Sequence, residues 1–100
     1  MADERDPDEI EVEWDTNKES INQKKHGIGF YEAATVFFDP LSITAPDEKH
    51  SIGEQRHNIL GESEHGDLMV VTFTERGTRL RVISARQATR SEKREYEESN

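Results

Sequence analysis

The sequence contains no cysteine, and this absence narrows the chemistry available to the chain. It removes disulfides, thiolate nucleophiles and cysteine-ligated zinc, so a small secreted scaffold held by disulfides is excluded. The sequence also has no apolar run near the roughly 20 residues that span a bilayer, and it begins without a basic and then apolar signal segment. We therefore expect a cytoplasmic protein with no membrane role.

Apolar residues are scarce, at 31% of 100 residues against 35% charged residues. A chain of this length has room for one domain with a modest core. Residues 1–9, MADERDPDE, combine acids with a proline and have little apolar surface to bury, which predicts a flexible acidic leader. A single domain over residues 10–98 follows.

The formal net charge of −9 conceals a basic segment near the C-terminus. Residues 76–94 hold seven cationic side chains and one acid, a sum of +6 that leaves −15 for the other residues. Such a patch is typical of a surface that binds phosphate groups. It also fits a solvated face whose cations are balanced by acids nearby in space. The cationic residues are Arg76, Arg79, Arg81, Arg86, Arg90, Lys93 and Arg94.

Two helices are predicted before the sheet. Thr16 and Glu19 form a T-x-x-E capping box, and Gly27 is a suitable stop, which predicts a helix over residues 17–26. Residues 30–37 carry Phe and Ala at the i, i+3, i+4, i+7 spacing of one buried face, and Asp39-Pro40 ends this second helix.

Strand patterns fill most of the remaining chain. Short turn-rich connections between the last three strands favour an antiparallel meander. Thr89 and Glu92 form a second capping box before a short, mostly exposed helix. The sequence thus predicts an α+β fold with two N-terminal helices packed on a twisted antiparallel sheet. The predicted strands are 10–14, 41–45, 56–60, 68–74 and 79–84.

Several motifs carry a family resemblance. Their order and spacing from Val12 to Glu98 resemble the BrnT family of toxins from type II toxin–antitoxin systems. The motifs are EWDTNKES, KKHGIGFYEAATVFFDPLSIT, PDEKHSIGEQRHNILG, TERG and RLRVISARQATRSEKREYEE. The resemblance implies a RelE-like fold and cleavage of RNA to slow translation. It also implies a BrnA-like antitoxin with a ribbon-helix-helix part as partner. Only the antitoxin would contact DNA.

If the resemblance carries over, the RNA's own 2′-hydroxyl is the nucleophile and no metal or other cofactor is expected. His26, beside Lys25, is then the candidate acid or base, because histidine titrates closest to neutral pH. Both residues equally suit the last turn of a helix, where cations meet the dipole favourably. His50, His57 and His65 are expected to have ordinary surface or core-edge roles.

Arginines are the candidate phosphate ligands, because a guanidinium donates two parallel hydrogen bonds to phosphate oxygens. Strand alternation puts Arg79, Arg81 and Ile83 on one face and Leu80, Val82 and Ser84 on the other. Arg81 is the preferred catalytic arginine, with Arg56 and Arg86, while Arg76 and Arg79 are expected to bind substrate. For each of them a salt bridge to one of the many acids is the competing interpretation.

Tyr96 has two possible roles at the C-terminus. RelE-like ribonucleases often place an aromatic residue near the scissile phosphate, and a tyrosine can stack on a base. As the sole apolar residue of its helix, Tyr96 also suits a structural anchor.

Two function classes stay open for the chain as a whole. One is a ribonuclease toxin, and the other is a non-catalytic subunit that mainly binds its antitoxin and regulates their promoter.

Overall fold

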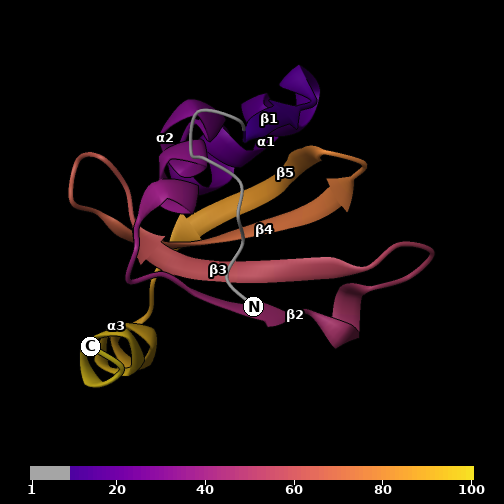
Figure 1. Ribbon diagram of the computed structural model, residues 1–100. Helices are drawn as coiled ribbons and strands as arrows, with labels where there is room; N and C mark the ends of the chain where they lie inside the picture. Colours follow the sequence, from indigo (N-terminus) through magenta and orange to yellow (C-terminus); the bar gives the residue numbers. More distant parts are fainter. Residues whose placement is uncertain (1–9) are drawn as a thin grey trace.

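The computed structural model describes residues 10–100, and the leader predicted for residues 1–9 lies outside them. Five strands form one sheet in the order β1-β5-β4-β3-β2 (Figure 1). No described helix is long and apolar enough to cross a membrane. In chain order the elements are β1 (Glu11–Trp14), α1 (Thr16–His26), α2 (Phe30–Thr35), η2 (Val36–Phe38), β2 (Ile43–Pro46), η3 (Glu48–His50), β3 (Arg56–Glu62), β4 (Leu68–Arg76), β5 (Arg79–Gln87) and α3 (Arg90–Glu98).

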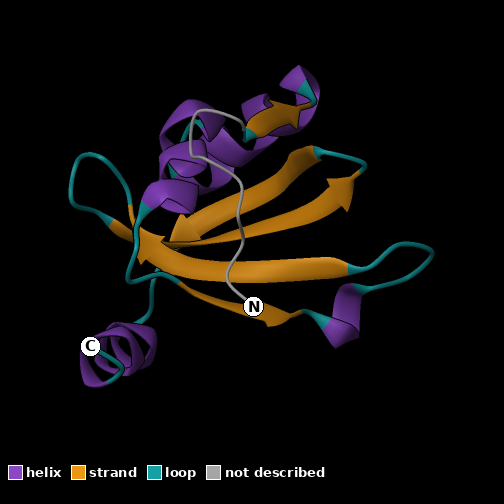
Figure 2. Cartoon of the chain, viewed as in Figure 1, coloured by secondary structure: helices purple, strands orange, loops and turns teal. Residues whose placement is uncertain are grey.

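The helices lie on two sides of the sheet (Figure 2). On one side α2 and η2 bury Phe30, Ala33 and Val36 against the sheet; this side is called the helix face. The opposite side, called the open face, is covered at one end by α3, where Tyr96 packs on Leu60, Val70 and Ala88. The predicted α+β fold is confirmed. The main core also contains Ile28, between α1 and α2. From the sheet it contains Ile59, Met69, Val71, Phe73, Leu80, Val82 and Ala85.

Strand pairing confirms the predicted meander and adds one parallel pair. β2, β3, β4 and β5 pair antiparallel in sequence order. β1 instead joins the far side of β5 as a parallel strand, with Val12 opposite Leu80. A parallel pair needs a long crossover, and the whole chain between these strands supplies it.

The predicted capping box at Thr16 and Glu19 is wrong. The N-cap of α1 is Asp15, whose carboxylate accepts from the backbone N–H groups of Asn17 and Lys18. Both hydrogen bonds lower the pKa of Asp15, and the one from Lys18 N has the larger effect. The Glu19 carboxylate accepts instead from Phe30 N at 2.8 Å, so it supplies the cap that Gly29 cannot give to α2.

The other helix ends follow the predictions. Gly27 has the left-handed conformation, with φ of 73°, that ends α1. The capping box of Thr89 and Glu92 is present at the start of α3. The second predicted helix is split, because its last turn tightens into the 3₁₀ helix η2 before Asp39.

The predicted alternation along β5 fails after Val82. The pairing with β4 shifts register between Thr72 and Phe73, so Phe73 lies opposite Val82 while Thr72 lies opposite Ser84. This bulge gives β5 one extra residue and reverses the direction of the side chains that follow. Ser84 therefore lies on the open face, and Ala85 enters the core.

Candidate functional site

Two hollows on the open face meet at Arg56. Both are lined by Arg56, Ile83 and Ser84. The first also contains His50 of η3 and Arg86 of β5, and the second contains Lys25 and His26 of α1. We call the continuous surface formed by these residues the Arg56 surface. Asp47, Asn58, Val70 and Thr72 complete the first hollow, and Lys18, Ile21 and Asn22 complete the second.

The backbone of Arg56 is clamped to the turn that carries His50. Asp47 N donates to Arg56 O at 2.8 Å. Arg56 N donates to the Ser51 hydroxyl at 2.9 Å, and that hydroxyl donates to Asp47 O at 2.6 Å. This closed set of hydrogen bonds holds η3 against the start of β3. It therefore fixes the position of the backbone that carries His50 relative to that of Arg56.

His50 is paired with a carboxylate. Its Nδ1 lies 3.0 Å from Asp47 Oδ2 and 3.2 Å from Asp47 Oδ1. With Nδ1–H donated to this carboxylate, Nε2 is the nitrogen left to exchange a proton. Within residues 10–100 no group of three or more His, Asp and Glu is arranged as metal ligands are.

The side chain of Arg56 offers a donor with no protein acceptor. Its Nε is buried, and among the described residues none accepts a hydrogen bond from it. Buried polar atoms in folded proteins almost always have a partner, so such an atom calls for an explanation. Its acceptor would have to come from a molecule outside the described chain, either a water molecule or an anion.

α1 brings Lys25 and His26 to the Arg56 surface along the edge of β5. Beyond the end of β1 no strand of the described residues lies beside this edge, and Asn22 fills the gap: Ala85 N donates to its Oδ1, and its Nδ2 donates to Ala85 O. His26 is half-buried and Lys25 is exposed at the end of this helix. The candidate acid or base is therefore held on a helix that is fixed to the sheet.

The remaining arginines are not brought together. Arg76 contacts Glu54 at 3.6 Å, and Arg79 contacts Glu11 at 3.0 Å, both at the exposed β4–β5 turn. Arg81 shares the open face with Arg56, and Thr74 of β4 lies between them. Arg81 contacts Glu13 at 3.3 Å and lines neither hollow. Each of these three arginines is therefore paired with a carboxylate, which was the competing interpretation of the basic segment.

Arg86 lines the first hollow and also ties β5 to α3. Its two terminal nitrogens donate to the two carboxylate oxygens of Glu92 at 2.7 Å and 2.9 Å. These hydrogen bonds, with a further one from Thr89 N, lower the pKa of Glu92 to about 2. The same pair raises the pKa of Arg86, so both members stay charged near neutral pH.

Tyr96 is an anchor in this structure. Its ring is buried between α3, which carries it, and the sheet. Its hydroxyl donates to Asp39 Oδ2 at 2.6 Å. Burial, and then the Asp39 carboxylate, raise the pKa of Tyr96. Burial alone would raise the pKa of Asp39, but hydrogen bonds from Glu62 N, Tyr96 and Leu41 N together lower it. Tyr96 lines neither hollow of the Arg56 surface.

The sequence analysis did not single out the pair of His50 and Asp47, which the structure places in the first hollow. A signal was available, because Asp and His three residues apart in PDEKHS lie on the same side of a single 3₁₀ turn. His57 has the expected core-edge role, stacked on Phe73 with ring centroids 5.4 Å apart. His65 lies exposed in the turn between β3 and β4.

The fold is similar to a solved toxin structure. The ribonuclease toxin BrnT of Brucella abortus has a TM-score of 0.64 and 25% sequence identity, covering 81% of this chain and 99% of that chain. Among curated proteins none matches the sequence. The fold and this likeness place the chain in the class of small α+β proteins that share the fold of that toxin.

The family profile described as ribonuclease toxin, BrnT, of type II toxin–antitoxin system matches residues 14–92. The chain belongs to this family, as its motifs indicate. Membership implies an antitoxin as partner, since a type II system pairs a toxin with a protein that counteracts it.

Proposed function

We propose that this chain is an endoribonuclease toxin that cleaves RNA at the Arg56 surface without a metal ion. The single observation that supports this most is the meeting of two histidine-bearing hollows at one arginine. Arg56 lines one hollow with His26 and the other with His50. A phosphate bound at Arg56 would thus have a proton-transfer group available on either side.

The chemistry requires two proton transfers and one stabilised charge. One histidine takes the proton of the 2′-hydroxyl as its oxygen attacks phosphorus, forming a 2′,3′-cyclic phosphate. The other gives a proton to the 5′-oxygen as the bond from that oxygen to phosphorus breaks, so the protons balance. Arg56 and Arg86 neutralise the negative charge that grows on the phosphoryl oxygens, where a guanidinium is effective because it stays protonated.

His50 is suited to one of these transfers because Asp47 orients its ring. A carboxylate that accepts from Nδ1–H fixes the tautomer and the orientation of the ring, and leaves Nε2 for the transfer. His26 has no such partner among the described side chains and lies in the last turn of α1. Lys25 adds positive charge to the same hollow.

In this proposal the partner is a BrnA-like antitoxin with a ribbon-helix-helix part, in the cytoplasm. The antitoxin neutralises the nuclease, and the pair reaches DNA only through the antitoxin. Arg90, Lys93 and Arg94 on α3 guide substrate or contact this partner. These roles rest on family membership and on the resemblance of the motifs.

The test uses purified chain, several structured RNAs and buffer containing EDTA. Wild type should cleave RNA and leave 2′,3′-cyclic phosphate ends, while Arg56→Ala, His50→Asn and His26→Asn should each slow cleavage by on the order of 100-fold. His65→Asn is the matched control, since His65 is exposed and outside both hollows. Intact RNA after incubation with folded wild type would end the nuclease proposal.

One observation favours the second function, a non-catalytic subunit that acts through its antitoxin. Four arginines, at positions 76, 79, 81 and 86, already contact carboxylates. If they are only structural, induced expression of the chain should leave growth and RNA unchanged, while the complex with antitoxin still forms and binds promoter DNA. Growth arrest relieved by Arg56→Ala would instead favour the nuclease.

A further inference from the structure

Two aromatic side chains are exposed on the outer side of α2 and η2. Tyr31 is 70% exposed and Phe38 is 46% exposed. They lie seven positions apart along the helical segment and line the same two hollows, with Thr35 between them. Exposed aromatic residues of this size are typical centres of protein interfaces.

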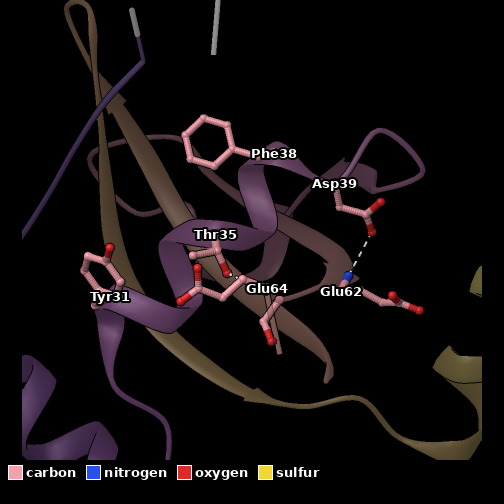
Figure 3. A pocket seen from close by; sticks show the side chains of 7 residues that line it. Tyr31, Thr35, Phe38, Asp39, Glu62 and Glu64 are labelled. Atoms are coloured by element: carbon pink, nitrogen blue, oxygen red, sulfur yellow. Dashed lines mark hydrogen bonds between the residues drawn. The ribbon is translucent and has the colours of Figure 1, made fainter. Parts of the chain in front are cut away.

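The two hollows adjoin and differ in character. One is apolar and extends from Tyr31 and Phe38 to the side chains of β1. The other, about 510 Å³ in volume, extends to Glu62 at the end of β3 and to Glu64 in the turn that follows (Figure 3). Together they form what we call the α2 groove. Its further lining residues are Ile10, Val12, Trp14, Ala34, Thr35, Asp39 and Ser63.

Hydrogen bonds within the chain hold the groove in shape. Glu64 N donates to the Thr35 hydroxyl at 2.9 Å, and that hydroxyl donates to Glu32 O at 2.6 Å. The Ser63 hydroxyl donates to the Glu32 carboxylate at 2.8 Å. The turn is therefore fixed to α2, and a partner binds a surface that needs little ordering.

Charge decides which occupant fits. No Lys or Arg is among the described residues that line the α2 groove, whereas Asp39, Glu62 and Glu64 are. Phosphate groups would be repelled by these carboxylates, so a nucleic acid does not suit the groove. A second copy of this chain would bring another net charge of −9 against an acidic rim.

We propose that the α2 groove binds a cationic amphipathic segment of the antitoxin, whose apolar side chains contact Tyr31 and Phe38 and whose Lys or Arg residues face Glu62 and Glu64. The inference rests on the proposed toxin function, because it takes the antitoxin as partner. The groove lies on the helix face of the sheet, whereas the Arg56 surface lies on the open face. The antitoxin is thus held at a place distinct from the nuclease site.

The experiment measures, by calorimetry at two salt concentrations, the binding of a full-length BrnA-like antitoxin to the full chain. Tyr31→Ser should weaken binding by about tenfold or more, because a buried aromatic anchor is lost. The double variant Glu62→Lys with Glu64→Lys should weaken it similarly and reduce its dependence on salt. Both should leave RNA cleavage unchanged.

Matched controls separate the groove from general surface effects. Ile52→Ser removes an apolar side chain that is 88% exposed elsewhere. Glu75→Lys with Glu97→Lys makes the same change in net charge at exposed sites outside the groove. Both controls should bind antitoxin as wild type does. Hydrogen exchange should show protection by antitoxin at residues 30–38 and 62–64.

Three results would overturn the docking proposal. These are absence of binding by wild type, unchanged affinity in the groove variants, and a dimer of the chain alone that Tyr31→Ser converts to monomer. The last result would assign the groove to a second copy. Loss of affinity in the groove variants with no RNA cleavage by wild type would leave the docking site standing while the nuclease proposal falls.

Discussion

The side-chain amide of Asn22 takes the place of a strand beside Ala85. Its Oδ1 accepts from Ala85 N at 3.1 Å, and its Nδ2 donates to Ala85 O at 2.9 Å and to Ile28 O at 3.1 Å. Asn22 is 5% exposed. One amide thus satisfies three backbone groups and fixes α1, with His26, to the edge of the sheet.

Asn22→Ala should be strongly destabilising because it leaves these three backbone groups without their partner. Buried unsatisfied backbone groups cost about 1–3 kcal/mol each, so three of them predict a loss of at least about 3 kcal/mol in the free energy of unfolding. Urea denaturation followed by Trp14 fluorescence measures it. Ser20→Ala, an exposed change on the same helix, should stay within about 0.5 kcal/mol of wild type. Equal losses in the two variants would contradict this role of Asn22.

Asn22 also shows why part of the fold could not be predicted from the sequence. Local signals were sufficient for the helix ends at Gly27 and Thr89, because capping depends on residues close in sequence. The bulge that turns Ser84 to the open face depends on pairing with β4, and the parallel partner of β1 is 68 residues away along the chain. Such non-local pairings leave no mark in the local pattern.

The candidate site was predictable to a similar extent. Arg56, Arg86, Lys25 and His26 were singled out by residue type and motif, and the structure places all four on the Arg56 surface. Arg76, Arg79 and Arg81 were singled out by the same criterion and lie outside the two hollows, although Arg81 was the preferred catalytic arginine. Composition revealed the excess of cations but not which acids they would meet, because those acids lie in β1 and in the loop before β3.

The pair of Arg86 and Glu92 predicts how stability depends on pH. The pKa of Glu92 is lowered in the folded chain from 4.5 to about 2. Its contribution is therefore complete above about pH 4.5 and is lost as the pH falls towards 2. At pH 7, Glu92→Gln should lower the free energy of unfolding by about 1–2 kcal/mol after allowance for solvent screening.

The measurement is the difference in unfolding free energy between wild type and Glu92→Gln across this pH range, which should shrink as the pH falls. Glu97→Gln, an exposed change on the same helix, provides the comparison. A difference between wild type and Glu92→Gln that stays constant from pH 7 to pH 2 would show that the ion pair does not stabilise the fold.

Tyr96→Phe separates the anchor role from a role in substrate binding. The change removes the hydrogen bond to Asp39 but keeps the ring in its cluster, so we expect a loss of about 1 kcal/mol of stability. RNA cleavage should be unchanged at a temperature where both proteins are folded. Thermal unfolding and a cleavage assay on the same preparations test this. Reduced cleavage with unchanged stability would place Tyr96 at the substrate instead.

The arginines offer the sharpest test of where the phosphate binds. Arg56 lines both hollows and has a buried donor without a protein acceptor, whereas Arg81 is engaged by Glu13 and lines neither hollow. Arg56→Ala should therefore slow RNA cleavage by on the order of 100-fold, and Arg81→Ala by less than about threefold.

Salt dependence gives a second measure on the same two variants. A side chain that contacts phosphate contributes about one unit to the slope of log affinity against log salt, so Arg56→Ala should reduce that slope and Arg81→Ala should not. Circular dichroism establishes that both variants are folded. If Arg81→Ala produced the larger defect in both measurements, the phosphate would bind nearer to β1. The meeting point of the two hollows would then not be the site of cleavage.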